Sequence, residues 1–502
     1  MAIAEHGASA PIAAAPSGAS LKNWGLIAAI AVLIAILLAP TPAGLPLAGQ
    51  RMLAIFGFAV MVWITEAFDY AISAIVIAAL MAVLLGLSPS VADPKVLYGT
   101  AQGLTVAMSG FGNTALTLVA AALFLAAAMT ITGLDRRIAL MVLRRVGART
   151  NRVVIGSIVV AVILAFLVPS ATARAAAVIP IMMGVIAAFG VERKSRFAGM
   201  MMITTVQAVS IWNVGIKTAA AQNMIAVGFF QSILHQDVTW VNWLIAAAPL
   251  SLLLSVILYY IMMYMMPPEA AEMPGGQAAV EKALAGLGPM SAEEKRLLTV
   301  SLILLCFWAT EGILHRFDSS TTTTVAVALL FLPRVGVMDW KKANTLIPWG
   351  TVVLFGVGIS LGTALLQTQA AQWLAGLIVQ WFGLDQLTGI AVLAVLATFL
   401  VVIHLGFASA TALAATMIPI IIAIVQKVQT PGISVLGITL LLQFVVSYGF
   451  ILPVNSPQGM LAYGTGTFAV RDFVRTGLAI TVVAYVLTLL FGATYWHWLG
   501  YV

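Results

Sequence analysis

Two short polar segments of nearly the same sequence lie half a chain apart in an otherwise apolar sequence. The segments 170–180 (SATARAAAVIP) and 409–419 (SATALAATMIP) differ at three of eleven positions. Their hydroxyl groups can hydrogen-bond an oxyanion, and a helix that begins there adds the positive end of its dipole. Small residues also permit close helix packing, but the repetition favours a paired anion-binding site. The residues assigned to it are Ser170, Ala171, Thr172, Ser409, Ala410 and Thr411.

Two basic residues lie within apolar stretches close to these segments. Arg174 belongs to the first segment and Lys217 to a later polar interruption. A cation at the centre of a bilayer costs about 2.5–3.5 kcal/mol on insertion scales, so each needs a counter-charge. That partner is either a carboxylate of the protein or a bound anion, and we favour the anion. The carboxylates available within spans are Glu66, Asp69 and Glu311.

A second pair of polar interruptions completes the set of candidate residues. The first covers residues 212–223 and the second, bounded by prolines, covers 453–459, where the backbone cannot stay helical. Plain loops at a membrane edge are the alternative. We predict substrate contacts from Thr218, Asn223, Asn455, Ser456 and Pro457. His404, five residues before the second Ser-Ala-Thr segment, suits either proton coupling or, as we favour, a hydrogen-bonded packing role.

The composition requires a membrane to surround these residues. Hydrophobic residues make up 62% of the 502 positions and charged residues only 8%, whereas soluble proteins carry about 25% charged residues. The apolar runs are continuous rather than alternating, so the spans are helices and not the strands of a barrel. The prediction is an all-α polytopic membrane protein of about 11 transmembrane helices.

Element order divides the chain into two similar halves. A repeated polar patch in matching positions is typical of transporters built from repeats, and we expect two inverted repeats with two re-entrant hairpins. The expected parts are a disordered tail (1–21), a first half (22–266), a linker (267–295) and a second half (296–502). In the first half we expect a hairpin (101–130), a broken helix (153–190) and the break at 212–223. In the second half we expect a hairpin (346–368), a broken helix (388–426) and the break at 453–459.

Several motifs in this order resemble the divalent anion/sodium symporter family, whose members carry dicarboxylates, citrate and sulfate. The resemblance covers about residues 52–477. It is carried by Trp63-Ile64-Thr65-Glu66-Ala67, Gly133-Leu134 through Arg137-Ile138-Ala139-Leu140, the two Ser-Ala-Thr segments, Pro348-Trp349-Gly350 and Leu452-Pro453-Val454-Asn455-Ser456-Pro457. It implies a homodimer with a scaffold and a moving domain, an elevator motion, and hairpins at 101–130 and 346–368 whose tips meet the two segments.

The sequence departs from that family where its members bind sodium. The family's Ser-Asn-Thr signature, whose asparagines contact substrate and sodium, has alanine here at positions 171 and 410. The first break keeps only Asn223 of the family's pattern, and Gly459 stands where the family has asparagine in the second. Both sodium sites therefore look degraded, while Arg174 and Lys217 add fixed positive charge that can replace a bound cation.

These observations together predict a secondary transporter for a small di- or trivalent anion, most simply a sodium-independent exchanger. The alternatives are a sodium- or proton-coupled symporter and, less favoured, an anion channel. No enzyme is expected, because the sequence shows no His/Asp/Glu cluster at ligand spacing and only one cysteine, Cys306. We expect no cofactor, no metal site and no nucleic acid. The expected partners are the anion, membrane lipids and a second copy, in a bacterial inner membrane.

Overall fold

The computed structural model describes residues 18–147, 149–188, 190–270, 276–428 and 433–502. In chain order the helices are α1 (Gly18–Leu38), α2 (Leu47–Thr65), α3 (Tyr70–Leu80), α4 (Thr100–Met108), α5 (Thr114–Thr132), α6 (Leu134–Val146), α7 (Thr150–Leu167), α8 (Ala171–Ala188), α9 (Arg196–Gly215), α10 (Ala221–Phe229), α11 (Trp240–Met265), α12 (Gly276–Gly286), α13 (Ala292–Thr310), α14 (Ser319–Phe331), α15 (Trp340–Leu346), α16 (Trp349–Gln367), α17 (Ala370–Phe382), α18 (Gly389–His404), α19 (Ala410–Lys427), α20 (Val435–Val446), α21 (Pro457–Tyr463), α22 (Val470–Ala493) and α23 (Tyr495–Trp498).

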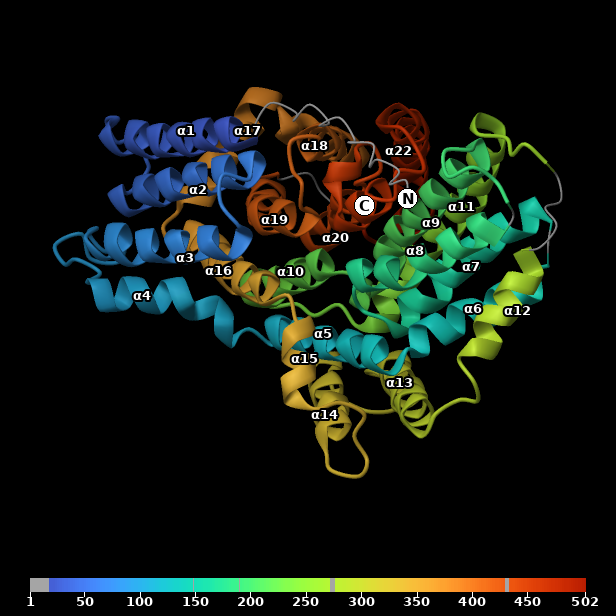
Figure 1. Ribbon diagram of the computed structural model, residues 1–502. Helices are drawn as coiled ribbons and strands as arrows, with labels where there is room; N and C mark the ends of the chain where they lie inside the picture. Colours follow the sequence, from blue (N-terminus) through green and yellow to red (C-terminus); the bar gives the residue numbers. More distant parts are fainter. Residues whose placement is uncertain (1–17, 148, 189, 271–275, 429–432) are drawn as a thin grey trace, which may run out of the picture.

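The prediction of an all-α polytopic membrane protein is confirmed. Within the described residues, nine helices are long and apolar enough to cross a membrane, and the two β-bridges are isolated. The total of about 11 spans stays a prediction. In the view of Figure 1, α1–α4 form one side, α6, α11 and α12 the other, and α10, α19 and α20 lie between them.

The first broken segment is a hairpin, not a helix that crosses once. Thr150, at the start of α7, donates to the carbonyl of Ala270 (2.8 Å), and the backbone N–H groups of Arg196 and Phe197, beyond α8, donate to the Glu269 carboxylate (2.6 and 3.0 Å). Two 18-residue helices laid end to end would separate these residues by about 54 Å. The chain therefore turns back at Val168–Ser170, and the basic residues on both sides of the hairpin lie at the same end.

The segment 388–426 folds back in the same way. A Cβ atom on Gly389, the first residue of α18, would lie 3.3 Å from Ile433, which follows the end of α19 by only six residues. Six residues reach at most about 20 Å, much less than two helices end to end. The chain turns between His404 and Ser409. Both segments predicted as broken helices are thus the hairpins of this protein.

The two segments predicted as hairpins have other structures. Helices α4 and α5 make almost no contact with each other and follow one another in the same direction, joined by a short 3-10 turn at Ser109–Gly112 (Figure 1). In the second half, α16 is one uninterrupted helix from Trp349 to Gln367. The predictions at 101–130 and 346–368 are therefore wrong. Glycines that interrupt an apolar segment can be seen in the sequence. Whether the chain turns back or continues after them cannot.

Two further boundaries differ from the prediction. The linker 267–295 contains α12 and the first turn of α13, and residues 271–275 lie outside the described part. The predicted tail, 1–21, lies outside it up to residue 17, and α1 begins at Gly18. The breaks within 212–223 and around 453–459 are present, because α9 ends at Gly215 before α10, and α20 ends at Val446 before α21.

Matching contacts support the division into two similar halves. Trp63 donates to the Ser73 hydroxyl (2.8 Å), and Trp308 of the repeated motif donates to Thr323 (3.1 Å), each linking two consecutive helices. Across the halves, α10 packs on α19 and α21 packs on α8. Each half therefore supplies a short helix to the hairpin of the other. An inverted relation between the halves stays a prediction.

A buried ion pair fastens the helices between the halves. Arg137 on α6 pairs with Glu294 on α13 (2.6 Å) and donates to the carbonyls of Leu287, Gly288 and Pro289, just beyond α12. The side chains of the pair are 9% and 5% exposed. If one partner is removed, the other charge keeps little exposed surface and loses its counter-charge.

We therefore expect Arg137→Met to lower the free energy of unfolding by about 3–5 kcal/mol, because Glu294 would stay buried without its cation. The measurement is thermal unfolding in detergent. The control is Lys342→Met, which removes one partner of an exposed pair with Asp339 (3.7 Å) and should change little. Equal shifts for both variants would contradict this role of the pair.

Candidate functional site

Both Ser-Ala-Thr segments line a single cavity of about 500 Å³ near the middle of the fold. Its walls come from the two hairpin tips and from the two helix breaks, with α3, α5 and α16 on the remaining sides. Hydroxyl and amide side chains from both halves meet there. The residues that supply them are Ser170, Thr172, Asn213, Thr218, Gln222, Thr351, Ser409, Thr411, Ser456 and Gln458.

The two hairpin tips have the same local structure. Ser170 precedes α8 and accepts a hydrogen bond from the N–H of Ala173 (3.3 Å), and Ser409 precedes α19 and accepts one from the N–H of Ala412 (3.2 Å). Both are N-caps, so the first turns of α8 and α19 open on the cavity. Pro169 sets the first tip, because it forces the preceding residue, Val168, into an extended conformation.

The two helix breaks share one backbone geometry at a spacing of 236 residues. A 3-10 turn covers Lys217–Ala219 in the first and Pro453–Asn455 in the second. The next residue is extended in both, with φ −149° and ψ 145° at Ala220 and φ −150° and ψ 140° at Ser456. Helices α10 and α21 then begin at matching positions. Residues of the two breaks can therefore be compared one by one.

This comparison identifies two glutamines that sequence reasoning did not assign to the site. Gln222 donates to Ser447 in the other half (3.2 Å), and Gln458 donates to Ser210 in the first half (3.0 Å). Both line the cavity. Gln222 follows Ile216 in the sequence by as many residues as Gln458 follows Leu452, and this equal spacing was the signal that could have identified them.

The predicted asparagines hold the breaks rather than line the cavity. Asn223 donates to the carbonyls of Asn213 and Ile216 (2.7 and 3.1 Å). Asn455 donates to the carbonyls of His404 and Phe407 in the second hairpin tip (2.8 and 2.9 Å). Each amide donates to two carbonyls that would be hydrogen-bonded within a regular helix. Where the backbone is irregular in an apolar interior, such carbonyls need another donor.

Arg174 lies directly behind the cavity wall. It is fully buried, and its Nη2 donates to the side-chain oxygen of Asn213, which lines the cavity, and to the carbonyl of Ala219 (3.0 Å). Its Nε and Nη1 have no hydrogen-bond partner. None of the carboxylates considered from the sequence pairs with it in the described residues. Its positive charge therefore has no protein counter-charge in contact.

Lys217 is buried too, but its surroundings differ. It is 5% exposed and feels the electrostatic attraction of Glu311, Asp237 and Asp318. Glu311 is already engaged, because it accepts hydrogen bonds from Ser319 and from the N–H of Trp240. Lys217 does not line the cavity. The sequence left two possible counter-charges for each cation, a carboxylate of the protein or a bound anion. The protein carboxylates explain Lys217 better than Arg174.

Of the residues predicted to bind substrate, nine line the cavity and four do not. Those that line it are Ser170, Ala171, Thr172, Thr218, Ser409, Ala410, Thr411, Ser456 and Pro457. Arg174, Lys217, Asn223 and Asn455 stand behind its walls, and their role in binding stays a prediction.

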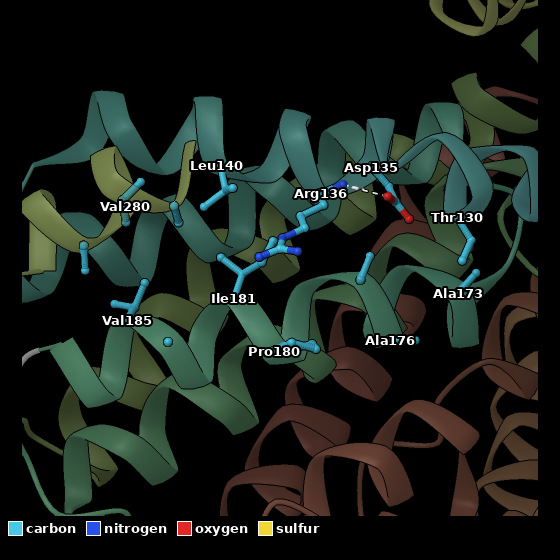
Figure 2. Close-up of a pocket in the computed structure, with 15 residues that line it drawn as sticks. Thr130, Asp135, Arg136, Leu140, Ala173, Ala176, Pro180, Ile181, Val185 and Val280 are labelled. Atoms are coloured by element: carbon cyan, nitrogen blue, oxygen red, sulfur yellow. Dashed lines mark hydrogen bonds between the residues drawn. The ribbon is translucent and has the colours of Figure 1, made fainter. Parts of the chain in front are cut away.

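A second cavity, of about 480 Å³, lies on the other side of α8 between α6 and α12 (Figure 2). Its walls are mostly alanine and aliphatic side chains, with Asp135 and Arg136 on α6. Burial raises the pKa of Asp135 to about 6. The first cavity also has a carboxylate on its wall, Asp69, but hydroxyl and amide side chains from both halves line it, whereas Thr130 is the one such side chain among the described residues on the wall of the second cavity. The first cavity is therefore the better candidate for anion binding.

The fold and the first cavity define a polytopic membrane protein with a polar cavity lined by helices of both halves. Residues 20–502 match the family model of the sodium:sulfate symporter transmembrane region. The chain belongs to this family, which confirms the resemblance. Because the family consists of membrane transporters, the protein is a multi-pass transporter of bacterial membranes and not an enzyme.

Relatives extend over nearly the whole chain. It is 56% identical over 491 residues to a membrane protein of Cupriavidus necator, covering 98% of this chain and 95% of the relative. It is 29% identical over 486 residues to the L-tartrate/succinate antiporter of Shigella flexneri, covering 94% and 98%. The solved YdaH transporter of Alcanivorax borkumensis shares 12% identity and a TM-score of 0.54 over 87% of this chain and 98% of that one, a likeness of fold alone.

The backbone of the second break leaves no room for a side chain at Gly459. A Cβ atom there would lie 2.5 Å from the carbonyl oxygen of Pro453. We expect Gly459→Ala to lower stability by about 1–3 kcal/mol, measured by thermal unfolding. The control is Gly464→Ala, whose nearest neighbour would lie 3.5 Å away. If both variants unfold at the same temperature, the Pro453 carbonyl is not held as described.

Proposed function

We propose that the protein exchanges small dianions of the four-carbon dicarboxylate class across the membrane without sodium. One observation carries the proposal: the N-terminal turns of α8, α10 and α19 all contribute to one hydroxyl- and amide-lined cavity, with Arg174 behind it. Helix N-termini favour negative charge, and hydroxyl and amide donors fit carboxylate oxygens. The L-tartrate/succinate antiporter of Shigella flexneri, similar over 94% of this chain, supports the same class.

Charge balance supports exchange that does not depend on sodium. A dianion that enters a buried cavity needs positive charge nearby, because the uncompensated charge would be costly in an apolar interior. Arg174 supplies such a charge with no carboxylate of the described residues in contact, whereas the charge of Lys217, within the first break, is largely offset by Glu311, Asp237 and Asp318. The alanines at 171 and 410 remove the side-chain carbonyls that the family uses for sodium.

The proposal includes an elevator motion of the block that holds the cavity. This block consists of the two hairpins, α7–α8 and α18–α19, and of the helices on either side of the two breaks, α9–α10 and α20–α21. These elements pack on each other across the halves. The amphipathic helices α6 and α17 connect it to the helices before it in each half. A homodimer is part of the same proposal and rests on family membership.

The choice between the two cavities can be tested on a single helix. Ala171 lines the polar cavity and Ala177 the apolar one, and both are half-buried on α8. We expect Ala171→Phe to stop uptake of labelled L-tartrate into proteoliposomes loaded with succinate, because the ring fills the binding space. Ala177→Phe is the matched control and should keep most of the uptake. Loss in Ala177→Phe alone would assign transport to the other cavity.

Sodium independence has its own measurement. Uptake into loaded proteoliposomes should be the same in sodium and in choline buffers, and should fall when internal dianion is omitted. Arg174→Gln should weaken binding by about tenfold or more, as expected if at least 1.4 kcal/mol of charge interaction is lost. The control, Arg136→Gln, removes an exposed arginine of the second cavity. Strict dependence of the unmodified protein on sodium would overturn this part of the proposal.

A further inference from the structure

His404, the last residue of α18, is buried, and its ring makes no hydrogen bond of normal geometry with the described residues. It is 2% exposed, and neither Nδ1 nor Nε2 has a partner. The hydrogen-bonded packing role that we favoured from the sequence stays a prediction, because the backbone of Asn455 is close enough to act on the ring. Most buried polar side chains in proteins are paired, so an unpaired imidazole calls for an explanation.

The ring of His404 faces the second helix break. A Cβ atom built on Gly449 would lie 3.2 Å from the Nε2 of His404 and 3.1 Å from the carbonyl oxygen of Asn455. The ring nitrogen and that carbonyl thus converge on the same small space. The side chain of Asn455 holds the His404 carbonyl in return (2.8 Å). The neighbouring residues Ser409 and Ser456 line the cavity.

The first half has a permanent cation in the matching place. At the spacing of 236 residues, Asn455 corresponds to Ala219 and Gly449 to Asn213. Ala219 and Asn213 are the two residues to which Arg174 donates. His404 therefore lies beside the residues that match Asn213 and Ala219, which Arg174 contacts through the Asn213 side chain and the Ala219 carbonyl. The sequence counterpart of Arg174 in the second hairpin is Leu413, which has no charge.

Among the described residues, no charged side chain acts on the ring of His404, and the polar group that does is the backbone of Asn455. Tyr448, beside Gly449, is bonded to Thr488 (2.7 Å), and Tyr70, near the second hairpin tip, donates to Glu66 (3.2 Å). The other titratable groups on the elements that pack against α18 are Lys427 on α19 and Arg471, Asp472, Arg475 and Tyr485 on α22.

We propose that His404 is a proton-binding site coupled to the anion, the titratable counterpart of Arg174. This rests on the proposed function. With the cavity empty, the imidazole stays neutral, because burial disfavours its charged form and no carboxylate compensates it. A dianion in the cavity supplies that compensation, so the ring takes one proton from water on the side from which the anion enters. The proton leaves with the anion on the other side.

The test measures binding and proton uptake by the full-length protein, with L-tartrate as the probe. Both carboxyls of this probe ionise well below about pH 6, so its own charge is constant over the window used. Between about pH 6 and 8, affinity should rise by up to about tenfold for each unit of decrease in pH. Binding in weakly buffered solution should also take up protons, which a merely structural histidine would not do.

Two variants assign the effect to a residue. His404→Gln should bind L-tartrate with little pH dependence and no proton uptake. His235→Gln, which changes an exposed histidine, should behave like the unmodified protein. Proton uptake by the unmodified protein is measured without any variant, so the test holds even if His404→Gln fails to fold. Binding without proton uptake, or unchanged uptake in His404→Gln, would overturn the proposal and leave the exchange function standing. Absence of L-tartrate binding in every protein would instead overturn the proposed function.

Discussion

The structure depends on satisfying backbone groups where helices stop in an apolar interior. Two hairpin tips and two helix breaks leave carbonyl and N–H groups without helical partners, and lipid chains cannot replace those partners. Side-chain amides take over this task, often from the other half of the chain: Gln207 donates to the carbonyl of Phe450 (2.8 Å), and Gln222 and Gln458 bond across the halves in both directions. The cavity is therefore enclosed by a cross-linked frame.

That frame is nearly the same in both halves, but the charges on it are not. The breaks agree in turn type and in the dihedral angles of Ala220 and Ser456. A permanent cation, Arg174, stands behind one break, and a titratable imidazole, His404, stands behind the other. Backbone geometry and charge thus vary independently between the halves, so a common architecture can accept different ions or protons at its two positions.

Sequence alone identified the cavity better than the fold around it. The repeated Ser-Ala-Thr segments and the residues Thr218 and Ser456 line one cavity. They could be recognised because a repeated motif is visible in the sequence whether or not the chain turns back at it. Chain direction was the error: the hairpins were placed at 101–130 and 346–368, whereas they are α7–α8 and α18–α19. Apolar runs with a polar interruption have the same composition whether the chain continues or turns back. Gln222 and Gln458 were missed because their equivalence required a residue-by-residue alignment of the breaks.

The same charges offer a physical reason why such a carrier would exchange rather than leak. Without a bound anion, Arg174 lies buried with two nitrogen atoms unpaired and no carboxylate in contact. Moving that arrangement through the apolar centre of a membrane is unfavourable, because the desolvated charge has nothing to compensate it. If the block moves as we propose, a bound dianion would supply the compensation, and the loaded block would cross more easily than the empty one. Under the proposed function, return of the block then requires a second anion, which is the condition for obligatory exchange.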